Sequence, residues 1–156
     1  MNESATATAN QPEFNIEKLF VKDLSLEVPH APSIFLEREA PQVDMQMSTE
    51  HSAIGEGIYE VVITLTLTAK LPAQDKVMFL IEAQQAGIFH VRNIPAAEME
   101  PVLAVVCPNI LYPYIREVVT DVSVRAGFAP VLLNPINFDA LYQQQKAQAA
   151  TAATKH

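Results

Sequence analysis

The side chains capable of acid–base, nucleophilic or metal chemistry are few and lie far apart in the sequence. The histidines share no spacing typical of a metal site: His30, His51, His90 and His156. Cys107 is the one cysteine, so the chain can form neither an internal disulfide nor a zinc site built from several thiolates. The four glycines form neither a P-loop nor a dinucleotide-binding motif. The sequence therefore predicts no catalytic residues, no metal and no cofactor.

One pairing could still be considered as a catalytic centre. Cys107 could act as a nucleophile with His90, but a reactive thiol needs an exposed and electropositive site. Cys107 instead follows the apolar run at residues 102–106. We expect it to pack as a small apolar side chain, and we expect the acidic residues to be ordinary surface charges. The sequence does not point to an enzyme.

The charge of the chain favours basic partners. Eighteen acidic side chains face ten basic ones, which gives a formal net charge of −8. Residues 1–100 contain fifteen acidic and six basic side chains, whereas residues 101–156 contain three and four. Nucleic-acid backbones and anionic membranes repel such a protein. We therefore expect neither nucleic-acid binding nor direct membrane insertion.

Apolar side chains exceed what one small domain needs for its core. Hydrophobic residues make up 49% of the sequence and charged residues 18%, below the roughly 25% of average soluble domains. A stripe of Val43, Met45 and Met47 and the apolar loop around Phe35 add to this surplus. A subunit interface or an adaptable binding surface would each use such side chains. The residue pattern leaves both interpretations open.

The expected location is the cytoplasm. The N-terminus lacks the basic and apolar regions of a signal peptide, and no run approaches the roughly 20 apolar residues of a membrane span. A single cysteine fits a reducing compartment. We expect disordered tails at residues 1–12 and 149–156, on either side of one domain at residues 13–148.

Alternating apolar and polar residues predict four strands in the first part of the chain. The candidates are residues 14–28, 43–49, 58–71 and 77–85. In the first, the alternation slips near Glu17 and Lys18, which indicates a β-bulge. Beyond the slip, Asp23 and Glu27 share one face and Leu24 lies on the other. The short links between the last three candidates predict an antiparallel meander.

A long helix is predicted next. Six apolar residues recur at helical spacing: Met99, Leu103, Val106, Ile110, Tyr114 and Val118. Pro108 and Pro113 predict kinks, and Gly127 is placed to end the helix. Because other sides of this helix are apolar too, one side is expected to meet the sheet and another a second subunit. A short amphipathic helix is predicted from Phe138 to about Gln148.

Four stretches carry a resemblance to a known family. They are KDLSLEVPHAP, FLIEAQQAGIF, CPNILYPYIRE and LNPINFDALY, in this order, together with the pattern YEVVITLTLTA. Over residues 19–142 the sequence resembles the SecB family of bacterial protein-export chaperones. The resemblance implies an α+β fold: a four-stranded antiparallel sheet with a long kinked helix and a short C-terminal helix, assembled as a homotetramer (a dimer of dimers). It implies an ATP-independent cytosolic chaperone that holds unfolded precursor proteins in hydrophobic grooves and delivers them to SecA.

The resemblance also implies two binding surfaces. The family's SecA-contacting surface uses acidic groups on the sheet, and the residues of this chain that match it are Asp23, Glu27, Leu80 and Glu82. Strand alternation supports this match, because Asp23 shares a face with Glu27 and Leu80 shares a face with Glu82. Such a face would attract the basic, zinc-bearing C-terminal segment of SecA. For the groove that holds unfolded precursor proteins we predict seven residues: Phe35, Val43, Met45, Met47, Tyr114, Leu141 and Tyr142.

Two alternatives come from other classes of protein. One is a carrier or enzyme for a small ligand, against which the lack of any converging polar cluster argues. The other is an oligomerisation module that binds no client. A metabolite bound to the purified protein would favour the first, and a lack of affinity for unfolded chains would favour the second.

Overall fold

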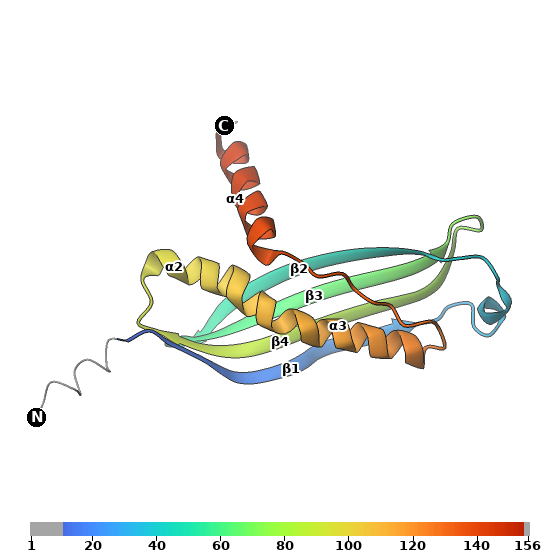
Figure 1. Cartoon of the computed structure of the whole chain (residues 1–156), viewed down its shortest axis with the longest axis horizontal. Helices are drawn as coiled ribbons and strands as arrows, with labels where there is room; N and C mark the ends of the chain where they lie inside the picture. Colours follow the sequence, from blue (N-terminus) through green and yellow to red (C-terminus); the bar gives the residue numbers. More distant parts are fainter. Residues whose placement is uncertain (1–10, 155–156) are drawn as a thin grey trace, which may run out of the picture.

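The computed structural model describes residues 11–154. These residues form a four-stranded antiparallel sheet with one long helix on one face, followed by a C-terminal helix (Figure 1). The α+β arrangement expected for the single chain is thereby confirmed. Two parts of the predicted tails lie outside the described residues: residues 1–10 of the N-terminal tail and residues 155–156 of the C-terminal tail.

The strands follow the order β1-β4-β3-β2 across the sheet. They are β1 (Glu13–Glu27), β2 (Gln42–Gly55), β3 (Ile58–Leu71) and β4 (Lys76–Arg92). The meander of β2, β3 and β4 is confirmed. Because β1 pairs with β4, the connection from β1 to β2 crosses from one sheet edge to the other, and it contains the 3-10 turn η1 (Ser33–Leu36). The second and fourth strands are longer than predicted.

Four register shifts interrupt the alternation of side chains in the sheet; one lies near the end of β2, between Ala53 and Gly55, and the other three are in the pairing of β1 with β4 and of β3 with β4. The predicted slip in β1 is confirmed, because the register shifts between Ile16 and Lys18 and leaves Glu17 as an extra residue. A second shift leaves Lys22 extra. A third shift makes Met78 the extra residue in β4, and Met78 is buried like its neighbour Phe79. Alternation in the sequence predicts that the Met78 and Phe79 side chains lie on opposite faces. This prediction is wrong because the bulge interrupts the alternation.

The long helix runs from Ala96 to Arg125 as three segments. They are α2 (Ala96–Pro101), the π-helical turn η2 (Val102–Val106) and α3 (Cys107–Arg125). The irregular turn precedes Pro108, whereas the sequence predicts kinks at the prolines themselves. A proline ring crowds the carbonyl group four residues earlier, and for Pro108 that residue, Ala104, lies in η2. A wider turn there accommodates the ring.

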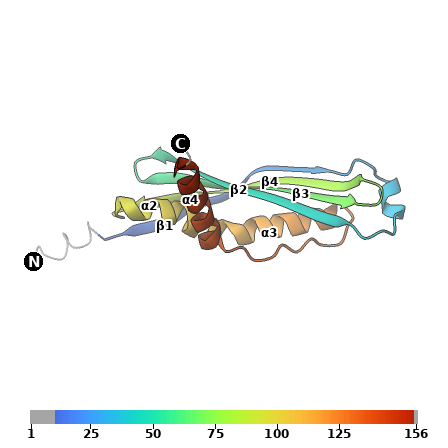
Figure 2. The same ribbon diagram turned by 90° about the horizontal axis from the view of Figure 1, so that it is seen from above.

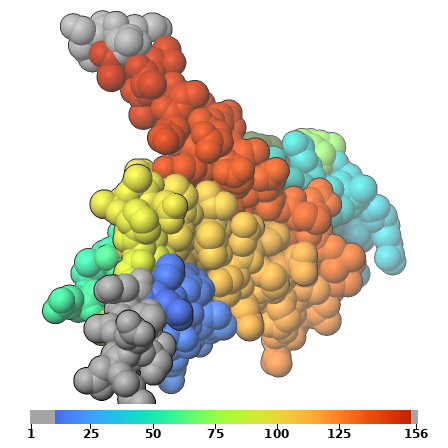
Figure 3. Space-filling view, turned by 60° about the vertical axis from the view of Figure 1, so that its left-hand side comes forward, coloured from blue at the N-terminus to red at the C-terminus, as the bar shows by residue number. Residues whose placement is uncertain are grey.

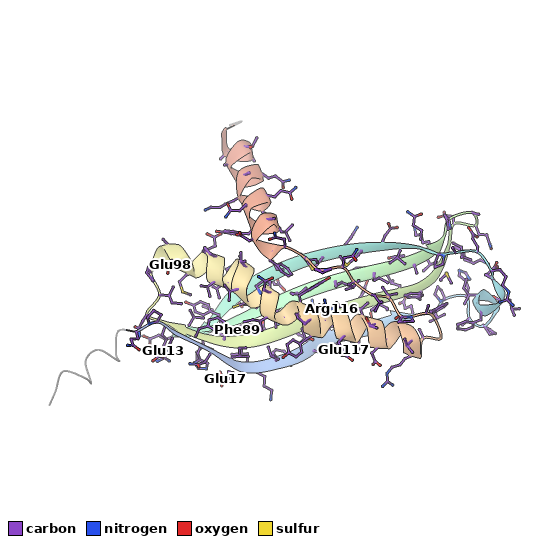
Figure 4. The ribbon with its side chains drawn as sticks, viewed as in Figure 1. Glu13, Glu17, Phe89, Glu98, Arg116 and Glu117 are labelled. Carbon is purple, nitrogen blue, oxygen red and sulfur yellow. The ribbon has the colours of Figure 1, made fainter. Side chains whose placement is uncertain are left out.

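The same helix is long and apolar enough to cross a membrane, by length and composition alone. Its most apolar 18 residues have a mean hydropathy of 1.4, which differs from the expectation that no run approaches the length of a membrane span. One side of it packs on the sheet (Figure 2), where Leu111, Ile115 and Val119 are fully buried. Phe89 of β4 lies between sheet and helix (Figure 4). This packing is that of a core helix.

The C-terminal part returns along α3 and then leaves the body. The hydroxyl group of Thr120 donates to the Val131 carbonyl at 2.7 Å, and the Val131 amide donates to Ser123 Oγ at 3.0 Å. Helix α4 (Phe138–Thr154) then projects outward (Figures 1 and 3). It continues past Gln148, where the sequence predicts a disordered tail, because its alanines and glutamines favour a helix.

Candidate functional site

An apolar groove lies between the start of β2, the start of β4 and the segment that follows α3. It has a volume of about 300 Å³. Its lining consists of apolar residues: Pro41, Val43, Met78, Phe79, Phe128, Ala129, Pro130 and Val131. We call this site the groove. Without a charged or polar side chain in its lining, it can accept apolar groups of many shapes.

Three aromatic rings extend the groove toward η1. The ring centroids of Phe79 and Phe128 are 4.6 Å apart, and those of Phe128 and Phe35 are 5.2 Å apart. Phe35 also packs on Gly127, where a Cβ would lie 2.9 Å from its Cε1 atom. Gly127 has a φ of 95°, so a glycine fits this position for both its backbone and its missing side chain. Stacked rings of this kind offer a site for a further aromatic side chain.

The structure brings some of the predicted client-binding residues to the groove. Val43 lines it, and Phe35 lies at the end of its aromatic row. Met45 follows Val43 on the same face of β2 and is 40% exposed, whereas Met47 is half-buried and packs on the core. Val43, Met45 and Met47 therefore run from the groove along the edge strand β2, whereas Phe35 belongs to η1. Their role in binding stays a prediction.

The other three predicted residues lie outside the groove lining. Tyr114 is exposed on α3, and Leu141 on α4 is half-buried against the core. Tyr142 is 8% exposed, and the Lys146 ammonium nitrogen lies 5.6 Å from the centre of its ring. Tyr142 thus presents little surface in the single chain. A role in client binding stays a prediction for all three.

The structure also adds residues that the sequence does not assign to a client site. Alternation identifies Phe79 and Met78 only as strand residues, and Phe128 belongs only to a general apolar surplus. Phe128 and Phe79 are far apart in the sequence and meet because the chain turns at Gly127. The local signal that could have found them is the Gly127-Phe128 pair directly after the helix.

A second surface lies on the sheet face opposite the helix, which we call the outer face. The register places Glu27 opposite Leu80, Ser25 opposite Glu82 and Asp23 opposite Gln84. Asp23, Glu27 and Glu82 are exposed and Leu80 is half-buried. The four residues predicted to contact SecA therefore form one continuous patch on two neighbouring strands, which we call the acidic patch.

Hydroxyl and amide groups surround the acidic patch. Thr64, Thr66 and Thr68 of β3 lie opposite Gln84, Glu82 and Leu80 in turn. The Gln84 amide donates to the hydroxyl oxygen of Thr64 at 3.3 Å. Short polar side chains thus border the patch on its β3 side. The patch can thus present its carboxylates to a basic partner.

The remaining candidates for chemistry do not assemble into a reactive centre. Cys107 is buried in the core, and burial raises the pKa of its thiol to about 12, so the thiolate required of a nucleophile is disfavoured. His90 lies on the outer face and contacts Glu17 of β1. Within residues 11–154 no three side chains from His, Cys, Asp and Glu come together as metal ligands.

Comparisons with known proteins give a consistent result. Residues 7–149 match the family model SecB, described as preprotein translocase subunit SecB. The protein-export protein SecB of Nitrosomonas europaea is 59% identical over 143 residues, which cover 92% of this chain and 89% of that protein. The protein-export protein SecB of Methylobacillus flagellatus is 56% identical over 156 residues, which cover 99% and 98% of the two chains.

A solved structure shares the fold at lower sequence similarity. It is the SecB-like chaperone of Mycobacterium tuberculosis, in complex with a ChAD peptide from the HigA1 antitoxin. It aligns with a TM-score of 0.66 and 20% identity, over 85% of this chain and 94% of that one.

Proposed function

The chain belongs to the SecB family of protein-export chaperones, and we propose that it binds unfolded precursor proteins without ATP and delivers them to SecA. In this proposal it works in the cytoplasm, keeps precursors competent for translocation and uses no cofactor. The observation that carries the proposal is the groove, an apolar site with an aromatic row and no polar group to select one ligand.

The groove suits short apolar segments of an unfolded chain. Burying one large apolar side chain there contributes roughly 1.5–3 kcal/mol, which is weak and tolerant of sequence. Met45 and Val43 lead away from the groove along β2 and offer further apolar surface. The peptide bound by the mycobacterial chaperone of this fold supports the same kind of ligand.

Weak contacts of this kind gain strength from several copies of the site. We propose a homotetramer, arranged as a dimer of dimers, in which each chain contributes one groove. Two apolar areas of the single chain support this assembly. The first consists of Ile16, Val21, Leu24 and Leu26 on β1, and the second of Tyr114, Val124 and Leu132 on and beside α3. Several grooves on one particle would raise the apparent affinity through avidity.

Binding opposes folding by mass action. A protein that binds the unfolded form and not the native form lowers the fraction of client that can fold. No nucleotide is required, because release follows when SecA takes the client over. The acidic patch provides the SecA contact in this proposal, through charge complementarity with a basic segment of SecA. The patch lies on the face of the sheet away from the helix, so docking leaves the helix side free.

The proposal is tested by the refolding of a denatured precursor without ATP. An excess of the protein should slow refolding several-fold relative to the spontaneous rate. Val43→Asp places a charge in the groove and should remove most of this effect. Ile54→Asp is the matched control, because Ile54 is an exposed apolar residue on the same strand outside the groove. Refolding at the spontaneous rate with excess protein would refute the proposed function.

A further inference from the structure

A lysine lies beside the acidic patch on the outer face, where alternation in the sequence alone would not place it. Lys22 directly precedes Asp23, and adjacent residues of a regular strand point to opposite faces. The second bulge of β1 makes Lys22 the extra residue between Val21 and Asp23. Asp23 pairs with Gln84 on the outer face, and Lys22 reaches Glu60 on that same face. A positive charge is thus brought to the patch that is proposed to bind a basic partner.

Glu60 holds this positive charge away from the patch. The Lys22 ammonium group donates to both carboxylate oxygens of Glu60, at 2.9 and 3.1 Å. Because Lys22 is on β1 and Glu60 on β3, the pair spans β4. The Glu60 side chain is only 20% exposed, compared with 44% for Lys22. The carboxylate is therefore the more fixed partner, and it determines where the ammonium group lies.

The register gives the direction in which Lys22 is drawn. Glu60 lies opposite Ile88 of β4, whereas Asp23 lies opposite Gln84 and Ser25 opposite Glu82. Ile88 and Gln84 are separated by about 13 Å along the strand, and Ile88 and Glu82 by about 20 Å. These are separations between strand positions: the Lys22 side chain starts beside Asp23 and extends from there toward the row of Glu60. The ammonium group is thus drawn toward the end of the outer face that lacks the patch.

We propose that Glu60 is a positioning residue for the acidic patch. By pairing with Lys22, it prevents that lysine from turning toward Asp23 and neutralising the patch, and so it sets the rate at which a basic segment associates. This inference rests on the proposed SecA contact. Two other lysines lie on the outer face. Lys18 is opposite Ile88, in the same row as Glu60, and Lys70 is one step beyond Thr68; neither is next to an acidic residue of the patch in the sequence.

The test compares association rates of four variants with SecA and, separately, with an oligolysine peptide. Glu60→Gln releases Lys22 and should slow association about threefold or more at 0.05 M salt, with the difference fading at high salt. Glu50→Gln is the matched control, since Glu50 is an exposed outer-face acid opposite Val62, and among the residues described it forms no ion pair. Glu82→Gln, within the patch, serves as the positive control.

A double variant separates positioning from simple loss of charge. Lys22→Met with Glu60→Gln removes the released lysine and should restore association to about the wild-type rate. Equal rates for Glu60→Gln and Glu50→Gln, or a double variant as slow as Glu60→Gln, would overturn the inference. The thermal midpoints of all variants are measured to confirm folding. If SecA fails to bind the wild type while oligolysine still separates the variants, the proposed partner is wrong and the positioning role of Glu60 stands.

Discussion

Gly87 lies where the helix packs directly on the sheet. A Cβ atom there would lie 2.8 Å from Phe89 Cε2 and 3.1 Å from Leu111 Cδ2. Both neighbours are fully buried, so neither can move aside easily. We expect Gly87→Ala to lower the free energy of unfolding by about 1–3 kcal/mol, measured by chemical denaturation.

Gly55→Ala is the matched control for this substitution. Its new Cβ would meet only the Ile58 side chain: Cδ1 at 3.3 Å, which can turn away, and Cβ and Cγ1 at the ordinary contact distances of 3.6 and 3.7 Å. We expect a change below about 0.5 kcal/mol for it, typical of a surface substitution. Equal free energies of unfolding for Gly87→Ala and Gly55→Ala would contradict the close packing of helix on sheet at Gly87.

Cys107 makes stability depend on pH in the alkaline range. Burial raises the pKa of its thiol from 9.0 to about 12. Between these values the unfolded chain loses the thiol proton and the folded chain keeps it, so the free energy of unfolding falls as pH rises. The expected slope near pH 10 approaches about 1.4 kcal/mol per pH unit.

Cys107→Ala should remove this contribution, and the comparison is made by denaturation at several pH values from about 8 to 10.5, a range that spans the ordinary thiol pKa. The native thiol should also react slowly with a disulfide reagent near the lower end of this range, compared with the unfolded chain. If the free energy of unfolding falls with pH equally in the wild type and in Cys107→Ala, or if the native thiol reacts fast with the disulfide reagent, the thiol is not buried.

At the residue scale, the residues of the acidic patch were predictable and most of the groove was not. The family resemblance selects Asp23, Glu27, Leu80 and Glu82, and alternation places the two members of each pair on one face. The pairing of β1 with β4, which joins the two pairs into one patch, shows only in the structure. The groove instead depends on the contact of Phe128 with Phe79, which is set by how a turn and a bulge bring distant segments together. The local signal, the Gly127-Phe128 pair after the helix, marks the turn but not the strand residue that Phe128 meets.

The connection between β1 and β2 forms one wall of the groove and is held by exposed contacts. Glu39 accepts a hydrogen bond from the Ala73 amide at 3.0 Å, and Glu37 accepts one from the Gln74 side chain at 3.1 Å. The opposite wall is held to α3 by the partly buried hydrogen bonds of Val131. The first wall is thus the more easily displaced.

Glu39→Ala should therefore loosen this connection with little effect on global stability, about 0.5–1.5 kcal/mol for one exposed hydrogen bond. Amide hydrogen exchange should become faster at residues 29–41 and stay unchanged at residues 126–131. Glu39→Gln keeps an accepting oxygen and should behave like the wild type. Unchanged exchange at residues 29–41 in Glu39→Ala would mean that the contact does not hold the wall.

At the element scale, strand identity was predictable and strand ends were not. The end of β4 was missed because Ala86 and Gly87 carry no alternation signal, whereas pairing with both β1 and β3 keeps the strand extended to Arg92. The second bulge of β1, at Lys22, was also missed because its effect shows only in the pairing. In the helix, the sequence predicts kinks at Pro108 and Pro113, whereas the irregular turn lies before Pro108 and α3 continues through Pro113.

The described part of the single chain exposes large apolar side chains on β1 and on α3. At the scale of the whole molecule, the surplus of apolar side chains in the sequence indicated such surfaces but could not assign them to subunit contacts or to clients.

The proposed assembly predicts a particle of about 69 kDa, four times the chain mass of 17.2 kDa. Light scattering during size-exclusion chromatography measures this directly. Leu24→Glu, on the exposed apolar side of β1, should shift the mass toward smaller species because it buries a charge in the expected interface. Glu50→Gln, on the outer face, should leave the mass unchanged. A wild-type mass near that of one chain would contradict the tetramer.

The most direct test of client binding is calorimetric titration with one precursor protein in two forms, native and held unfolded. We predict that the unfolded form binds with a negative heat-capacity change, as expected when apolar surface is buried, and that the native form gives no binding heat. At about 0.1 mM, even a weak site of roughly −6 kcal/mol would be detected. Equal binding of both forms, or no binding of the unfolded form at this concentration, would contradict the account.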